Sequence, residues 1–116
     1  MERLLTPAEL EIMAVLWDVG GGTVHDVQAG LPDGRAYTTL STLLRILEQK
    51  GFATSRKDGR RHVYVPALSR ADYERTTVRD LLGRLFRGDA GALVRCLAEP
   101  LDARERASLK KLLDEP

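Results

Sequence analysis

The first half of the chain alternates between stretches in which apolar residues recur every three or four positions and short breaks rich in glycine or proline. That spacing is typical of amphipathic helices, whose apolar side faces a core. It predicts three helices in this part of the chain, over residues 7–19, 24–31 and 36–50. The third carries the clearest stripe, formed by Leu40, Leu43, Leu44 and Leu47.

Capping residues indicate where these helices begin and end. Thr6 and Glu9 form a capping box around Pro7, and this combination favours a helix start at the proline. Thr23 is placed to cap the second helix in the same way. Glycines at 20–22 and at 51 end the first and third helices, because glycine readily adopts the conformation that follows a helix.

The period of the pattern changes after the third helix. The segments FATSR (52–56) and RHVYV (61–65) have the composition of strands, and Asp58-Gly59 between them is a strong signal for a hairpin turn. Three helices followed by a hairpin describe a winged helix-turn-helix domain, which we expect over residues 1–68.

Residues 69–116 predict three more helices, over about 69–87, 89–98 and from 102 onward. Their apolar stripes are narrow, and the rest of so short a chain offers them no second core. Because most small oligomers are twofold dimers, we expect these helices to be a dimerisation region in which two copies pair. The expected interface residues are Val78, Leu81, Leu82, Leu85, Leu93, Leu97, Leu109 and Leu112. The expected fold class is therefore mainly α with a small β-hairpin.

The net charge of +1 hides an uneven distribution along the chain. Residues 1–34 hold six acidic residues and one basic residue, whereas residues 35–65 hold seven basic residues and two acidic ones. A basic stretch in a balanced chain is typical of a phosphate-binding surface. Chance clustering of charges on a solvated face explains the same distribution equally well.

The third helix carries small hydroxyls and one arginine opposite its leucines. Thr38, Ser41, Thr42 and Arg45 share one face at helical spacing. Short hydroxyls allow close approach, threonine packs against the thymine methyl group, and arginine reaches a guanine edge or a phosphate. As the second helix of a helix-turn-helix, this segment would enter the major groove. The alternatives are a solvated face that is merely rich in Ser and Thr, or a face that packs on the protein's own hairpin.

The hairpin adds a second group of basic residues, close to its tip. A basic wing lies along the DNA backbone or enters a minor groove, but the same charges also protect an edge strand from pairing with other chains. The residues expected to contact DNA are Tyr37, Thr38, Thr39, Ser41, Thr42, Arg45, Lys57, Arg60, Arg61 and His62.

Other functional classes find little support in the sequence. No apolar run approaches the roughly 20 residues of a membrane span, and no signal-peptide pattern is present, so we expect a cytoplasmic protein without membrane insertion. A single cysteine excludes a disulfide framework, and no nucleophile–base pair or phosphate-binding glycine loop stands out. We therefore expect neither an enzyme nor a bound metal or cofactor. Cys96 is expected to be a small buried hydrophobe, with a redox-sensitive thiol as the alternative.

Four strings of residues carry a family likeness: LTPAELEIMAVLW, TVHDVQAGL, AYTTLSTLLRILEQKG and GRRHVYVPALSRADY. In these strings the chain resembles the penicillinase repressor family (BlaI/MecI/CopY type) of winged-helix transcriptional regulators, from Leu5 to about Glu99. The resemblance implies a homodimeric repressor that binds double-stranded operator DNA through its third helix and wing. It also implies that the two copies pair through their C-terminal helices.

The signal that relieves repression stays open. Penicillinase repressors are inactivated by cleavage of an Asn–Phe bond in the dimerisation region, and Arg95-Cys96 occupies the matching position here without that motif. We treat Arg95 and Cys96 as regulatory candidates, and a sensor protease is not identified. Two other functions fit the same fold: an effector-sensing regulator with a ligand at the dimer interface, and a winged-helix protein-interaction module. The first needs a pocket with converging polar groups, and the second does not need the hydroxyl-and-arginine face.

Overall fold

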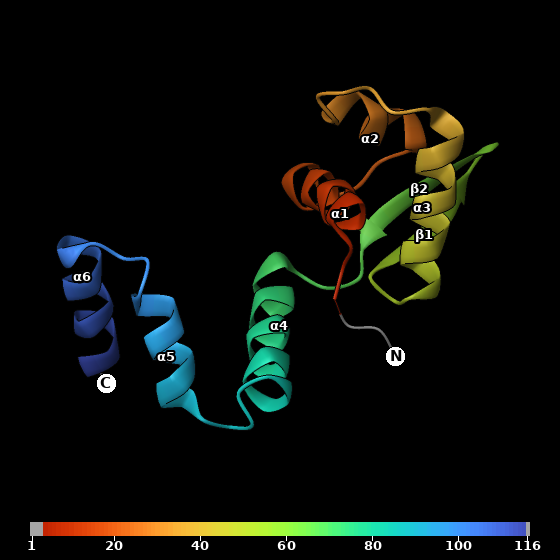
Figure 1. Cartoon of the computed structure of the whole chain (residues 1–116). Helices are drawn as coiled ribbons and strands as arrows, with labels where there is room; N and C mark the ends of the chain where they lie inside the picture. Colours follow the sequence, from red (N-terminus) through yellow and green to blue (C-terminus); the bar gives the residue numbers. More distant parts are fainter. Residues whose placement is uncertain (1–3, 116) are drawn as a thin grey trace. The chain divides into compact units, whose positions relative to one another are not determined.

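The computed structural model describes residues 4–115. Within them the chain forms mainly helices and one small hairpin, as expected (Figure 1). In order, the elements are α1 (Pro7–Val19), α2 (Val24–Gly30), α3 (Tyr37–Gln49), β1 (Ala53–Asp58), β2 (Arg61–Pro66), α4 (Arg70–Arg84), α5 (Ala90–Ala98) and α6 (Ala103–Asp114). The chain divides into two compact units, one ending at Arg75 and the other beginning at Thr76.

The core of the N-terminal unit forms where α1, α2, α3 and the hairpin meet. The helix starts are those that the sequence predicts: Thr6 and Thr23 both make complete capping boxes, with Glu9 and Asp26 respectively. From α1, Met13 and Leu16 are completely buried. The helical spacing of Leu10 and Met13 in the sequence predicts that both are buried, but Leu10 is 41% exposed. The wholly buried Ile12 takes its place in the core.

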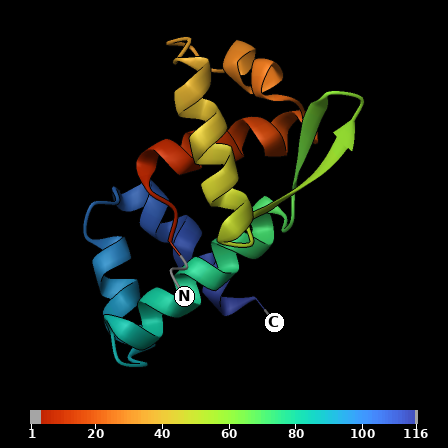
Figure 2. The same cartoon turned by 90° about the vertical axis from the view of Figure 1, so that its right-hand side faces the viewer.

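The third helix is anchored by its leucine stripe. Leu40, Leu44 and Leu47 are completely buried, and Leu43 packs against the same cluster from a partly buried position. Figure 2 shows α3 crossing α1, with the hairpin extending from the C-terminal end of α3. The buried leucines therefore decide which face of α3 remains available to a partner.

The hairpin pairs β1 and β2 in antiparallel register, with Asp58 opposite Arg61. The tight turn is therefore Gly59-Arg60, and the prediction of Asp58-Gly59 as the turn is wrong by one residue. Gly59 has a φ of +65°, which is the conformation that the first position of such a turn requires. As a result, the Arg60 side chain sits at the tip of the wing, and Asp58 belongs to a strand.

The start of α4 belongs to the N-terminal unit. Its buried Tyr73 accepts a hydrogen bond at the phenol oxygen from the Leu5 N–H, at 2.9 Å. The Tyr73 ring also lies 5.8 Å from the Trp17 ring and 5.9 Å from the Phe52 ring, measured between centroids. These contacts explain why the first compact unit extends past residue 68, the expected end of the first domain.

The C-terminal unit contains the rest of α4 together with α5 and α6. The helix α4 ends at Arg84, earlier than the expected 87, and the chain turns away through Arg87 and Gly88, which both have positive φ. Asp89 caps α5, and a capping box from Asp102 to Glu105 starts α6. The Arg106 guanidinium joins the two helices by donating to the Ala98 carbonyl at 3.2 Å. Among the described residues, no helix has both the length and the apolar character that crossing a membrane requires.

Candidate nucleic-acid interface

The polar face of α3 is open to solvent. Its exposed side chains are Tyr37, Thr38, Thr39, Thr42 and Arg45, and Ser41 is half-buried. Because the leucines hold the opposite face in the core, these six residues project from one side of the unit. A shallow depression lined by Thr38, Thr39, Thr42 and Leu43 lies on this face.

The hydroxyls of this face are not all equivalent. Thr42 Oγ1 donates a hydrogen bond to the Thr38 carbonyl at 3.0 Å, one turn back along the helix. The Thr42 hydroxyl proton is therefore engaged within the helix. The methyl group of Thr42 remains available to contact a partner. No such bond ties down the hydroxyl of Thr38, Thr39 or Ser41 within the described part of the chain.

The N-terminus of α3 lacks a side-chain cap. The N-cap residue is Ala36, which has no oxygen to accept from the first-turn N–H groups, whereas a Thr or Asp side chain caps α1, α2, α5 and α6. Uncapped N–H groups at a helix start favour an anion through their hydrogen bonds and the helix dipole. The missing cap can be recognised in the sequence, because alanine occupies a position at which a capping residue is usual.

The wing carries its basic residues on exposed positions. Arg56, Lys57, Arg60, Arg61 and His62 are all exposed, and in the register of the hairpin Lys57 lies opposite His62. Within residues 4–115, no carboxylate forms an ion pair with the four cations of the wing or with Arg45. These five charges lie on exposed side chains, where an external anion can reach them.

Two other basic residues of the 35–65 stretch serve the fold instead. The Arg35 guanidinium lies 2.7 Å from a Glu11 carboxylate oxygen and 3.2 Å from one of Asp33. Lys50 is paired with Glu9. Net charge by segment therefore overstates the basic surface, because sequence alone does not show which cations have internal partners.

A hollow of about 110 Å³ joins the wing to the start of α3. It is lined by Thr23, Val24, His25, Tyr37, Ser41, Arg60, Arg61, His62 and Tyr64. Five of the residues expected to contact DNA thus share one site, while Thr38, Thr39, Thr42, Arg45 and Lys57 lie outside it. Thr23 and His25 are not among the expected contact residues, because no sequence pattern indicates that the start of α2 reaches the wing.

Backbone contacts hold the wing beside the helices. Gly22 and Tyr64 exchange two hydrogen bonds, from the Gly22 N–H at 2.9 Å and from the Tyr64 N–H at 2.8 Å. Gly21 has a φ of +141°, and a Cβ there would lie 2.8 Å from the Tyr64 carbonyl oxygen. The loop before α2 therefore needs glycine at this point to bring β2 so close.

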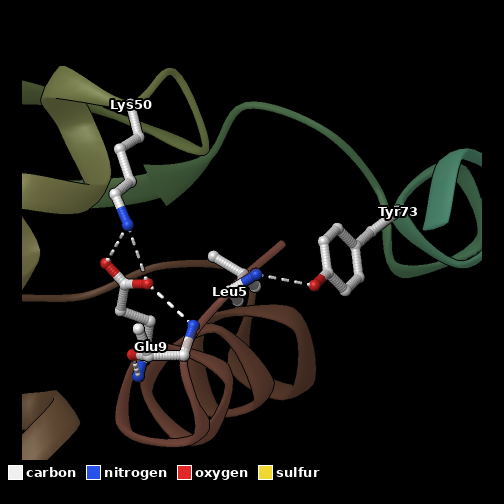
Figure 3. A network of polar contacts seen from close by, with 5 residues as sticks. Leu5, Glu9, Lys50 and Tyr73 are labelled. Atoms are coloured by element: carbon white, nitrogen blue, oxygen red, sulfur yellow. Dashed lines mark hydrogen bonds and ion pairs between the residues drawn. The ribbon is translucent and has the colours of Figure 1, made fainter. Parts of the chain in front are cut away.

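A buried ion pair fixes the other end of α3 (Figure 3). Lys50, the C-cap residue of α3, places Nζ 2.9 Å from Oε2 and 3.1 Å from Oε1 of Glu9, a side chain that is only 2% exposed. Burial raises the pKa of the Glu9 carboxyl, but the Thr6 N–H and the Lys50 ammonium lower it more, so the net pKa lies below the ordinary glutamate value. Glu9 thus caps α1 and holds α3 with one carboxylate.

The expected interface residues of the C-terminal unit are largely uncovered in the single chain. Val78, Leu81, Leu85, Leu97 and Leu112 are exposed, and Leu82, Leu93 and Leu109 are half-buried. Arg95 and Cys96 are both exposed on α5. The prediction of a buried Cys96 is therefore wrong for the single chain, because α5 buries none of its residues completely. Over residues 4–115, no three His, Cys, Asp or Glu side chains gather into a group that could hold a metal ion.

Comparison with known proteins gives one consistent result. A model of the penicillinase repressor family matches residues 5–115 of the chain. The penicillinase repressor of Bacillus licheniformis is 29% identical over 115 residues, which cover 96% of this chain and 90% of that protein.

Solved structures also resemble part of this chain, and two of them are informative. The monomeric form of Bacillus licheniformis BlaI, in complex with the blaP half-operator, has a TM-score of 0.51 at 32% identity and covers 60% of this chain and 88% of its own. The homodimeric winged helix-turn-helix DNA-binding domain Mb0332 of Mycobacterium bovis has a TM-score of 0.52 at 26% identity and covers 68% of this chain and 73% of its own. The winged helix-turn-helix fold expected from the sequence is thereby confirmed.

Proposed function

The chain belongs to the penicillinase repressor family, and we therefore propose that it is a sequence-specific transcriptional repressor that binds double-stranded operator DNA as a homodimer. The observation that carries this proposal is the surface formed by α3 and the wing. Five cations there form no ion pair with any carboxylate of residues 4–115, and they lie on the surface that also carries exposed hydroxyls and the uncapped start of α3. Double-stranded DNA fits all three features, because it has an anionic backbone and base edges that offer hydrogen-bond donors and acceptors.

Helix α3 acts as the recognition helix in the major groove. Arg45 reaches a guanine edge or grips a phosphate, and Thr42 presents its methyl group to a thymine methyl. Thr38, Thr39 and Ser41 donate hydroxyl hydrogen bonds to bases or phosphates nearer the start of the helix. These contacts supply the sequence specificity.

The wing and the start of α3 grip the DNA backbone. Lys57, Arg60 and Arg61 bind phosphates, and the Tyr37 hydroxyl together with the first N–H groups of α3 binds another. These contacts position the recognition helix and make affinity depend on salt, since each neutralised phosphate releases counterions.

Pairing through the C-terminal helices makes the repressor a dimer. The eight apolar residues from Val78 to Leu112 are expected to be covered by a second copy, which removes their apolar surface from water. A twofold dimer reads a pseudo-palindrome whose half-sites lie about 10–10.5 base pairs, or a multiple of that distance, apart. A role on chromosomal DNA implies a cytoplasmic protein in a bacterium. Membership in a repressor family also agrees with the expectation that the chain is not an enzyme.

Selection of bound fragments from randomised duplex DNA, at near-physiological salt, tests the proposal. Recovery of a twofold-related motif is expected, and recovery of unenriched DNA would contradict sequence-specific binding. On the selected duplex, Arg45→Ala should cost about 1–3 kcal/mol and relax specificity at one position.

Two further variants separate the roles of the contacts. Arg60→Ala should weaken binding to all sequences and lower the salt slope by about 1, because it removes one phosphate contact. Arg104→Gln removes the same charge from an exposed position of α6 that is not among the proposed DNA contacts, and it should leave both quantities unchanged. If Arg104→Gln weakened binding as much as Arg60→Ala, net charge alone would explain the affinity. Binding that is insensitive to salt would favour a protein-interaction module instead.

A further inference from the structure

Both histidines of the chain line the same hollow. His25 reaches it from the start of α2 and His62 from β2, although the two residues lie far apart in the sequence. The His25 ring lies 4.7 Å from the ring of Tyr37, between centroids, and this contact holds the imidazole at the start of α3. Histidine is the side chain whose charge normally changes between about pH 5 and 8, so the placement of both in one site is chemically informative.

We infer that this hollow holds a phosphate of the DNA backbone between His25 and His62, and that DNA affinity therefore rises as the two imidazoles take up protons. The inference rests on the proposed function and extends it, because it adds His25 to the interface and links binding to pH.

The lining suits a phosphate group. Arg60 and Arg61 supply fixed positive charge, and the hydroxyls of Tyr37 and Ser41 supply donors. The volume of about 110 Å³ is well above the roughly 10–15 Å³ that a single water needs. An imidazole that contacts a phosphate donates a stronger hydrogen bond when it is protonated, and the anion in turn favours the protonated ring.

Two other ionisable groups near the hollow, Asp26 and Tyr64, are not expected to change charge in the pH range in which histidine does. The Asp26 carboxylate accepts from the N–H of Thr23 at 2.9 Å, and this bond, followed by the charges of Arg61 and His25, keeps its pKa below the ordinary aspartate value. Burial raises the pKa of the Tyr64 phenol, and Glu48 raises it further while Arg45 lowers it. Asp26 therefore stays anionic and Tyr64 neutral through the range in which histidine titrates.

Across the hairpin, Lys57 lies opposite His62 and Asp58 opposite Arg61. The exposed side chains around His62 are thus mostly cationic, which adds to the attraction for a phosphate when the ring is protonated. On the α2 side, Asp26 is the acidic residue next to His25, and its carboxylate is engaged by the helix cap.

The test measures binding of the full chain to a mixed-sequence duplex at fixed ionic strength, from about pH 8 down to about pH 6. The wild-type protein should bind about tenfold more tightly at the lower pH, and the His25→Gln/His62→Gln double variant should show no such rise. Each single variant should keep part of the effect. Both histidines are exposed, so the variants are expected to fold, and a thermal melt of each at both pH values checks this.

Two further readouts do not depend on affinity alone. The salt slope of the wild-type protein should steepen by about 1–2 between the higher and the lower pH, since each newly neutralised phosphate adds about 0.9. Because the chain has two histidines, their ring proton resonances can be followed separately by NMR, with the single variants providing the assignment. Adding duplex near neutral pH should shift both toward the protonated form.

The outcomes separate the inference from the function on which it rests. DNA binding that is equally tight at both pH values, with unshifted histidine resonances, would overturn the inference and leave the repressor intact. A pH effect that persists in the double variant would also overturn it. Absence of DNA binding at every pH would overturn the proposed function and the inference together.

Discussion

The two units of the chain use the same residue types with opposite results. In the N-terminal unit, leucines such as Leu40 and Leu44 are completely buried, and Tyr73 is the last residue along the chain that belongs to the core. In the C-terminal unit, Leu85, Leu97 and Leu112 are 67%, 52% and 68% exposed. The difference shows that an amphipathic pattern specifies which face of a helix is apolar, whereas the topology decides whether the same chain can cover it.

Contacts between segments that are distant in the sequence hold the N-terminal unit together. The exchange of hydrogen bonds between Gly22 and Tyr64 and the ion pair of Glu9 with Lys50 each tie together residues about 40 positions apart. In the C-terminal unit the described side-chain bonds stay within a helix or join neighbouring ones, as Arg106 does with the end of α5. In the proposed dimer, therefore, a second copy would cover apolar surface of the second unit, whereas the first unit completes its core without one.

The largest effect should come from the core. Leu44→Ala should lower the free energy of unfolding by about 4 kcal/mol, because it leaves a cavity in a fully packed site. Urea unfolding followed by circular dichroism measures this loss, which should not depend on protein concentration. The matched change Leu85→Ala should cost little at low concentration and more at high concentration, since its burial requires a partner. Equal, concentration-independent losses at both positions would remove the contrast between the units.

The buried ion pair should come next. Lys50→Met should lower the free energy of unfolding by about 2 kcal/mol, because the Glu9 carboxylate stays buried without its ammonium partner. Lys110→Met removes the same charge from the exposed surface of α6 and serves as the control, with an expected change within about 0.5 kcal/mol. A change of similar size in both variants would mean that the pair contributes nothing specific.

Pairing should respond to charge on the apolar face of α4. Leu81→Asp should weaken dimerisation at least about tenfold, or about 1.4 kcal/mol, as measured by sedimentation equilibrium. Leu10→Asp is a close control, because Leu10 on α1 is 41% exposed and Leu81 is 40% exposed. If the Leu10 variant dissociated and the Leu81 variant did not, the interface would lie on the N-terminal unit.

The smallest effect should be the response to acid. Since the pKa of Glu9 is lower in the folded state than in the unfolded chain, its carboxylate stabilises the fold above the unfolded pKa. That contribution is lost as the pH falls from the ordinary glutamate pKa through the lower folded pKa. Urea unfolding at several acidic pH values should show a shallower loss of stability in Glu9→Gln than in the wild type. An unchanged dependence on pH would rule Glu9 out as a contributor.

Much of the fold could be predicted because its signals are local. Thr6, Thr23 and Asp102 cap helices at the positions where the sequence places them, and the leucine stripe of α3 identifies the face that is buried. The hairpin turn was misplaced by one residue because register depends on the pairing of both strands, with Tyr64 buried, and not on the turn dipeptide alone.

The site was predicted less completely because it depends on long-range contacts. The internal partners of Arg35 and Lys50 come from α1 or from the loop after α2, so sequence counting treats both residues as free surface charge. His25 joins the wing only through the packing of α2, and no spacing rule connects it to His62. Cys96 lies in phase with leucines, but phase does not reveal that Cys96 is exposed and that, within residues 4–115, no residue of α5 is fully buried.

The alanine at the start of α3 has a consequence for how this protein can evolve or be engineered. A search for heat-resistant variants would favour Ala36→Asp or Ala36→Ser, since a missing cap typically forgoes about 1 kcal/mol. The new side chain would occupy the N–H groups that, in the proposed function, meet the DNA backbone, and aspartate would also repel it. A substitution at this single position would thus raise thermal stability and lower operator affinity. In the proposed function, the less stable helix start is what allows tight binding to the operator.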